Sequence, residues 1–103
     1  MEIGCVYMLI IVAYDICVMD REGEKRLRKV AKFCERYGVR VQNSLFEMIL
    51  DFTQFKNLRG ELEKIIDNTR DSLRYYSLGN EWEGKVYKDG VSDAIQQGKT
   101  LIV

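Results

Sequence analysis

The chain has 103 residues and no histidine, and its 16 basic and 16 acidic side chains give a formal net charge of zero at pH 7. The missing histidine excludes a Ser-His-Asp triad, a Cys-His pair and a histidine zinc site within this chain, and the net charge alone does not indicate a nucleic-acid partner. Any hydrolytic chemistry must therefore use carboxylates, with or without a hard metal ion.

The length and composition indicate one globular domain with a single hydrophobic core. Three cysteines, an odd number without a C-x-x-C pair, favour a reduced, cytoplasmic setting. Residues 1–7 are predicted to be an upstream extension before a true start at Met8. The N-terminal stretch is too short between charges to span a bilayer, and it lacks the basic start and cleavage site of a signal peptide.

Residues 8–15, MLIIVAYD, are predicted to form the first strand. A short apolar run of this kind is typical of a strand that is covered on both faces. The run ends on Asp15, whose carboxylate must be hydrated, hydrogen-bonded or bound to a cation, because a buried unpaired charge is costly. The pattern leaves these alternatives open, and an aspartate at a strand end often just binds its own backbone in a turn.

Residues 20–38, DREGEKRLRKVAKFCERYG, are predicted to form the first helix. Asp20 can cap its N-terminus, and Gly38 can close its C-terminus in the left-handed conformation. The apolar residues recur at helical spacing and form a buried stripe of Leu27, Val30, Ala31, Cys34 and Tyr37. The basic residues of a different face are Lys25, Lys29, Lys32 and Arg36.

The middle of the chain is predicted to contain two strands and a second helix. Residues 39–43 and 44–50 are the strands, with a turn near Asn43 and Ser44. The second helix covers residues 51–67 and is capped by Asp51 or Thr53. Its apolar stripe consists of Phe55, Leu58, Leu62, Ile65 and Ile66.

The last predicted element of the domain is a fourth strand at residues 71–78, in which Tyr75 and Tyr76 point to opposite faces. The resulting order, βαββαβ, predicts an α+β, ferredoxin-like fold with an antiparallel sheet over residues 8–79. Residues 80–103 are predicted to form a C-terminal tail for dimer or partner contact, with KVYK as a candidate short strand and TLIV as a candidate strand or apolar anchor.

Both faces of the predicted central strand are apolar, although two helices can cover only one face of such a sheet. Residues on one face of this strand, such as Leu9 and Ile11, alternate with apolar residues on the other, such as Ile10 and Val12. A second copy of the chain is the economical cover for the remaining face. Two copies would bring two Asp15 side chains toward the symmetry axis.

Three blocks of sequence resemble the small CRISPR-associated Cas-two family: AYDI, KRLRKVAKFCERYGVRVQNSLFE and DSLRYYSLG. The similarity runs from about Met8 to Gly79, and its most specific parts are RVQNSLFE and DSLR. The resemblance implies a homodimeric, metal-dependent nuclease that cuts single-stranded RNA or double-stranded DNA. It also implies a role at the centre of the spacer-acquisition complex, where the dimer bridges copies of the Cas-one integrase.

The resemblance further implies roles for individual residues. Asp15 corresponds to the catalytic, metal-binding aspartate. If two Asp15 carboxylates face each other across the dimer axis, one Mg²⁺ ion shared between the two subunits would neutralise both. Arg40 and Phe46 correspond to residues implicated in activity, although Phe46 is more simply interpreted as a core residue. With the basic residues of the first helix, the predicted nucleic-acid contacts are Arg26, Arg28, Lys29, Lys32, Arg36 and Arg40. The supporting residues are Tyr14 and Phe46.

Two functions are therefore expected as alternatives: a Mg²⁺-dependent endonuclease that uses paired Asp15 residues, or a non-catalytic DNA-binding scaffold in which Asp15 is dispensable. In the scaffold, the basic faces and the tail would assemble the integrase. Trp82, Tyr87 and the final LIV of the tail would either cover a sheet edge or dock this partner. A small-molecule regulatory module is a third class that the fold alone allows, but the motif blocks argue against it. The predicted partners are a second copy, the Cas-one integrase and RNA and/or DNA, with no membrane.

Overall fold

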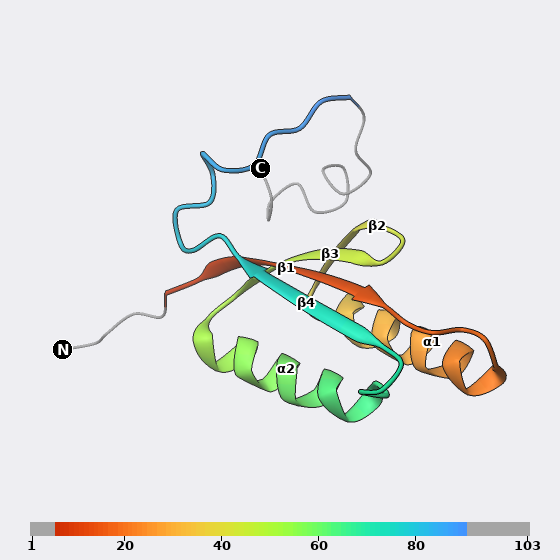
Figure 1. The fold of residues 1–103 in the computed structure, drawn as a ribbon. Coiled ribbons are helices and arrows are strands. Elements are labelled where there is room, and N and C mark those ends of the chain that lie inside the picture. The colour runs from red at the N-terminus through yellow and green to blue at the C-terminus, as the bar shows by residue number, and fades with distance from the viewer. Residues whose placement is uncertain (1–5, 91–103) are drawn as a thin grey trace.

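The computed structural model describes residues 6–90, which form six elements in the order β-α-β-β-α-β (Figure 1). The elements are β1 (Met8–Asp15), α1 (Arg21–Glu35), β2 (Gly38–Gln42), β3 (Leu45–Leu50), α2 (Phe52–Ile65) and β4 (Ser72–Ser77). This order confirms the predicted α+β, ferredoxin-like fold. Neither helix in the described part of the chain has the length and apolar content needed to cross a bilayer.

The four strands form one antiparallel sheet in the order β2-β3-β1-β4, with both helices on one face (Figure 1). β1 is central, because it pairs with both β3 and β4. Asp15 lies at the end of this central strand, opposite Ser72 of β4. The fold therefore places the candidate acidic residue at the end of a strand that has a neighbouring strand on each side.

The hydrophobic core lies between the sheet and the two helices. Its strand residues occupy alternate positions, as expected for one face of a pleated sheet: Ile10, Val12, Tyr14, Phe46, Met48 and Leu50. Its buried helix residues belong to the two predicted stripes: Val30, Cys34, Leu58 and Leu62. Tyr75 packs against this core, whereas the neighbouring Tyr76 is exposed, so the two tyrosines do face opposite ways.

Both helices begin where side-chain capping satisfies their first N–H groups. The Asp20 carboxylate accepts a hydrogen bond of 2.8 Å from the Gly23 amide, which confirms its predicted role. Asp51 caps α2, and Gln54 completes a capping box by accepting from the Asp51 amide. Of the two alternatives considered for this cap, Asp51 is correct and Thr53 is not.

The prediction that Gly38 closes the first helix in the left-handed conformation is wrong. α1 ends at Glu35, and Gly38 is the first residue of β2; the glycines with positive φ in residues 6–90 are Gly79 and Gly90. Gly38 is needed for a different reason. A Cβ atom there would lie 2.3 Å from the backbone oxygen of Glu47 in β3, so this position has no room for a side chain.

The segment after β4 does not form the short strand considered for KVYK. The Lys85 amide donates to the Trp82 carbonyl across a turn, and residues 86–89 are irregular. Before that turn the chain pairs briefly with β1, since Leu78 N–H donates to the Leu9 carbonyl at 2.9 Å. The segment then runs over the sheet on the side away from the helices (Figure 1). The other candidate strand, residues 100–103, lies outside the described residues.

Candidate functional site

Asp15 is exposed at the end of β1. Among residues 6–90, it takes part in no side-chain hydrogen bond and no ion pair. Alternation along the strand places its side chain on the sheet face opposite Tyr14, which is the face away from the helices. The structure thus does not show the turn contact that is the simplest explanation of an aspartate at this position, and the carboxylate is available to a cation.

A cleft of about 520 Å³ lies beside Asp15. Its lining is Tyr14, Asp15, Ile16, Val18, Leu27, Arg28, Ala31, Arg40, Asn43 and Ser44. Most of the lining surface is apolar, and Arg28 and Arg40 bring positive charge to it, whereas the Asp15 side chain projects from the other face of the sheet at the same end of β1. The structure therefore brings together four of the predicted site residues, Tyr14 and Asp15 from β1, Arg28 from α1 and Arg40 from β2.

Arg40 reaches the cleft from the helix side of the sheet. Its guanidinium lies 5.2 Å from the centre of the Phe46 ring and donates to the Glu35 carboxylate at 3.1 Å and the Asn43 carbonyl at 3.2 Å. Phe46 itself is fully buried, which confirms the interpretation of this residue as core. Its role is to support the Arg40 guanidinium by a cation–π contact.

Tyr14 also supports the cleft from within the core. Its ring stacks on Phe46 at a centroid distance of 6.2 Å, and its hydroxyl donates to the Asn43 carbonyl at 3.2 Å. Burial raises the pKa of Tyr14, so the hydroxyl stays protonated and keeps this hydrogen bond at neutral pH. The bond holds the β2–β3 turn against the end of β1.

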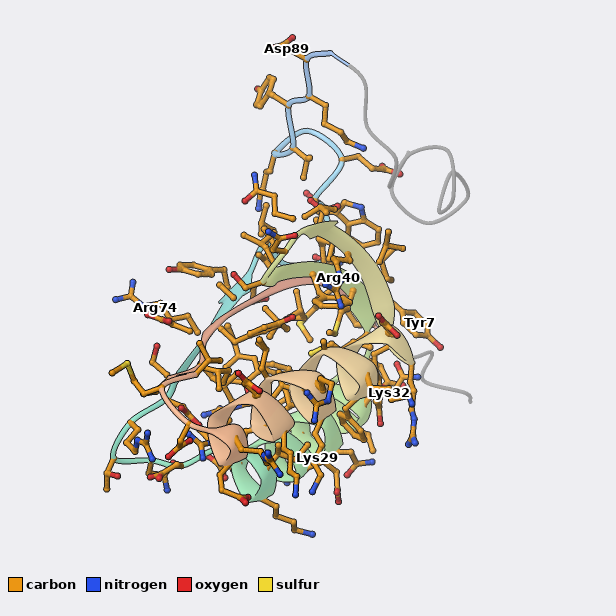
Figure 2. The ribbon with its side chains drawn as sticks, turned by 90° about the vertical axis from the view of Figure 1, so that its right-hand side faces the viewer. Tyr7, Lys29, Lys32, Arg40, Arg74 and Asp89 are labelled. Carbon is orange, nitrogen blue, oxygen red and sulfur yellow. The ribbon has the colours of Figure 1, made fainter. Side chains whose placement is uncertain are left out.

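The exposed surface of α1 carries a dense group of basic side chains. Lys25, Arg28, Lys29 and Lys32 line a second hollow along this helix. Figure 2 shows Lys29 and Lys32 projecting from α1. None of these four residues, nor Arg36, forms an ion pair within the described part of the chain. We refer to Lys25, Arg28, Lys29, Lys32 and Arg36 as the basic face of α1.

Arg26 does not belong to that face. Its guanidinium forms a two-bond ion pair with Asp71, at 2.7 Å from Nε and 3.2 Å from Nη2. The Arg26 side chain is only 15% exposed and that of Asp71 is fully buried. The resemblance assigned Arg26 to nucleic-acid contact, whereas the structure commits its donors to a carboxylate. We therefore leave Arg26 out of the proposed nucleic-acid surface.

Asp71 is a structural centre that the sequence analysis did not single out. Besides Arg26, it accepts hydrogen bonds from the amides of Cys17 at 2.9 Å and Asp67 at 2.8 Å. Burial by itself raises the pKa of Asp71, but these hydrogen bonds outweigh burial and lower it to about 2. One ionised carboxylate thus joins α1, the start of β4 and the loop that follows Asp15. The DSLR block contains this residue, but a sequence alone does not show what it bonds.

The donor set at Asp15 fits a hard, largely hydrated cation. Within residues 6–90 no group of three or more histidine, cysteine, aspartate or glutamate side chains could hold a metal ion. Mg²⁺ keeps several waters and is often bound through only one or two carboxylates. Asp15 supplies one such carboxylate from each chain, so two chains could supply both.

The sheet face away from the helices, which we call the open face, includes Asp15. Its other residues in β1, β3 and β4 are Leu9, Ile11, Ala13, Leu45, Glu47, Ile49, Ser72, Arg74 and Tyr76, and Val39 of β2 lies opposite Glu47 on the same face. Leu9 is fully buried, whereas Ile11, Leu45 and Ile49 are only partly covered. Burial raises the pKa of Glu47, against an opposing effect of Lys88 in the segment after β4. Among residues 6–90, most apolar side chains of this face are thus only partly covered.

The chain is similar to known proteins over most of its length. Residues 8–86 match the family model described as CRISPR associated protein Cas2. The chain is 48% identical to the CRISPR-associated endonuclease Cas2 of Halalkalibacterium halodurans, over 92% of this chain and 99% of that protein. It is 44% identical to the CRISPR-associated endoribonuclease Cas2 3 of Rhodospirillum rubrum, over 92% of this chain and 100% of that protein.

Solved structures show the same fold. The crystal structure of Streptococcus pyogenes Cas2 at pH 6.5 aligns with a TM-score of 0.70 and 43% identity, over 81% of this chain and all of that one. A hypothetical protein from Thermus thermophilus aligns with a TM-score of 0.68 and 35% identity, over 84% of this chain and 94% of that one.

Proposed function

The chain belongs to the CRISPR associated protein Cas2 family, and on this premise we propose that it is an endonuclease that hydrolyses phosphodiester bonds in single-stranded RNA and/or double-stranded DNA. Asp15 is the proposed catalytic residue. The observation that carries this proposal is the exposed Asp15 carboxylate, which has no side-chain partner among residues 6–90 and lies at the end of β1 that borders the cleft with Arg28 and Arg40. The names of relatives such as the H. halodurans endonuclease support it.

The proposed active form is a homodimer in which two open faces pack sheet to sheet over their apolar middles, so that the Asp15 end of each face stays accessible to the substrate. Support comes from the partly covered apolar side chains of Ile11, Leu45 and Ile49, because an apolar face of this kind gains free energy when a second copy covers it. Since Asp15 lies at the end of the central strand on this face, a two-fold axis nearby would bring the two carboxylates together.

The proposed mechanism divides the chemistry between Asp15, a cation and the arginines. Two Asp15 carboxylates would hold one Mg²⁺ ion, which when bound would lower the pKa of a coordinated water and offset negative charge on the phosphate. Arg28 and Arg40 would bind neighbouring phosphates and keep the strand in the cleft. The indirect role of Tyr14 and Phe46 is to hold Arg40 and the β2–β3 turn in place.

Ile11→Lys is expected to convert the dimer into a folded monomer. The lysine would lie opposite Glu47, its antiparallel partner, and could form an ion pair with it in the isolated chain. A dimer interface would have to bury the lysine charge, which disfavours dimerisation. Sedimentation velocity of the wild type and the variant measures this change. Thr53→Lys on the exposed surface of α2 adds the same charge as a control. A wild-type monomer, or a variant that dimerises as the wild type does, would contradict the sheet-to-sheet arrangement.

We further propose that the dimer takes part in new spacer acquisition with the Cas-one integrase and binds DNA through the basic face of α1. Reversing charge at Lys29, Lys32 and Arg36 is then expected to weaken duplex binding at least about tenfold. The salt dependence should also flatten, by roughly 0.9 in the log–log slope for each phosphate that the protein no longer neutralises. Fluorescence anisotropy across a KCl series measures both quantities.

The matched control for this variant reverses three charges on α2, at Lys56, Arg59 and Lys64. Because all three lie on an exposed surface of the other helix, net charge changes equally while the basic face of α1 stays intact. Equal weakening by both triple variants would show a general charge effect and would remove the assignment of α1 as the DNA-binding face.

The second candidate function is the non-catalytic scaffold. It is favoured by the small number of acidic ligands: one Asp15 per chain, and no larger metal-binding cluster in residues 6–90. The scaffold needs the basic face and the dimer but not Asp15. Substitution of Asp15 therefore separates the two candidates.

A further inference from the structure

The open face that carries Asp15 also carries a cationic group, the guanidinium of Arg74 in β4. β4 pairs with β1 so that Asp15 lies opposite Ser72 and Ala13 lies opposite Arg74. Opposite residues of an antiparallel pair project from the same face, and diagonal neighbours lie roughly 7–8 Å apart. Arg74 is the diagonal neighbour of Asp15, and its long side chain can reach groups bound at the carboxylate.

The charge of Arg74 is not neutralised by any carboxylate in the described part of the chain. Its one hydrogen bond there runs from Nη1 to the Tyr76 hydroxyl, at 3.2 Å, which leaves most of the five N–H donors of the guanidinium available. By contrast, ion pairs commit three other arginines to carboxylates, namely Arg26, Arg40 and Arg70. Figure 2 shows Arg74 pointing outward from the molecule.

Arg74 and Arg40 are the two arginines within the strands, and they lie on opposite faces of the sheet. Arg40 pairs with Phe46 in the register and lies over its ring, on the helix side. Asp15 projects from the other side, where Arg74 is the arginine within the strands. A phosphate held at the Asp15 carboxylates through a cation would therefore meet the Arg74 guanidinium first.

Resting on the proposed function, we infer that Arg74 is a second catalytic residue, which contacts a non-bridging oxygen of the phosphate that is cleaved. In that hydrolysis a water oxygen forms a bond to phosphorus, the bond from phosphorus to the leaving oxygen breaks, the water gives up a proton to solvent, and the leaving oxygen takes one from solvent. Negative charge on the non-bridging oxygens is redistributed in the transition state. A fork of N–H donors aimed there stabilises the transition state more than the ground state.

The test compares Arg74→Gln and Arg74→Lys with a matched control, Arg59→Gln, which removes one exposed arginine from α2. Steady-state cleavage is measured on whichever labelled substrate, single-stranded RNA or duplex DNA, the wild type cleaves and Asp15→Asn does not. Arg74→Gln is expected to lower kcat about 100-fold, with KM changed less than about threefold. Arg59→Gln is expected to change kcat by less than about threefold, since it leaves the site intact.

Two further readouts separate direct binding of the phosphate from a merely structural role. Arg74→Lys keeps the charge but not the two-pronged geometry, so it is expected to recover only about a tenth of wild-type kcat. Replacing one non-bridging oxygen of the cleaved phosphate with sulfur gives two diastereomeric substrates. The wild type is expected to cleave one of them more slowly than the normal substrate. This difference in rate should shrink in Arg74→Gln, because the guanidinium that contacts the substituted position is absent. Circular dichroism and sedimentation velocity check that each variant folds and dimerises. If Arg74→Gln does not fold or dimerise, the kcat of Arg74→Lys is compared with that of the wild type instead.

The outcomes are distinct. If Asp15→Asn is inactive while Arg74→Gln matches Arg59→Gln, or Arg74→Lys matches the wild type, the Arg74 inference is overturned and the proposed function stands. If cleavage by the wild type equals that of Asp15→Asn on both substrates, the proposed function itself is overturned and Arg74 has no reaction to assist.

Discussion

Replacing Asp15 with asparagine is expected to lower phosphodiester cleavage about 1000-fold, which corresponds to roughly 4 kcal/mol of transition-state stabilisation. The substitution keeps the shape of the side chain but removes the negative charge that would hold the cation. Because Asp15 is exposed and has no side-chain partner among residues 6–90, fold and dimer should be unchanged. Removal of Mg²⁺ with EDTA should reproduce the effect in the wild type.

The measurement is a quantitative nuclease assay of identically purified proteins across a series of Mg²⁺ concentrations and pH values. Asp89→Asn provides the control, since it makes the same change of charge in the segment after β4, far from the end of β1 (Figure 2). Cleavage that persists in Asp15→Asn at the level of Asp89→Asn would point to a contaminating nuclease and remove the enzymatic proposal. Abolished cleavage with intact spacer acquisition would instead show that the nuclease and scaffold roles are separate.

The second large effect is expected at Asp71, where Asp71→Asn should destabilise the fold by about 3 kcal/mol. The variant leaves the Arg26 guanidinium without its counter-charge in a site where its side chain is only 15% exposed. It also replaces an acceptor of hydrogen bonds from the Cys17 and Asp67 amides. For a domain of this size, the melting temperature should fall by roughly 12 °C or more, measured by thermal and urea unfolding at fixed protein concentration.

The stabilisation by Asp71 also has a defined pH dependence. Its pKa of about 2 in the folded chain lies below the value of about 3.9 expected in the unfolded chain. A lowered pKa means that the stabilisation is fully present above about pH 4 and is lost as the pH falls toward 2. The free energy of unfolding of the wild type should therefore decrease more steeply in this acid range than that of Asp71→Asn.

Glu61→Gln is the matched control for Asp71→Asn. It removes one acidic charge from an exposed ion pair with Lys64, and such pairs contribute only about 0.5 kcal/mol. A double-mutant cycle with Arg26→Ala measures the coupling between Arg26 and Asp71 directly. Equal stability of the Asp71 and Glu61 variants, or additive effects in the cycle, would contradict the role of Asp71 as a structural centre.

The fold could be predicted from the sequence because local signals and hydrophobic periodicity agree along most of the chain. The short apolar run of β1 favours a strand and the apolar stripe of α1 favours a helix, and Asp20 and Asp51 mark where the helices begin. The KVYK segment also alternates, but a strand needs a partner, and the sequence does not show whether a sheet edge is available to it.

The candidate site was only partly predictable, because its side chains come from separate elements. Asp15 was found from its position at the end of an apolar run, and Arg28 and Arg40 from the family resemblance. The sequence analysis placed Arg26 among the nucleic-acid contacts. Its ion pair with Asp71 could not be recognised from the sequence, because the two residues are 45 positions apart in the chain. Arg74 was missed for a similar reason, since only the pairing of β4 with β1 places it beside Asp15.

The close approach of β2 to β3 at Gly38 affects where the charge of Arg40 is placed. β2 is an outer strand, held on one side by β3 alone, and Gly38 sets how closely the two backbones approach. Two residues further on, the same strand carries Arg40 to the mouth of the cleft. Even a methyl group at position 38 would therefore tilt the strand and misdirect the guanidinium, so activity could be lost by a change that touches no chemical group of the site.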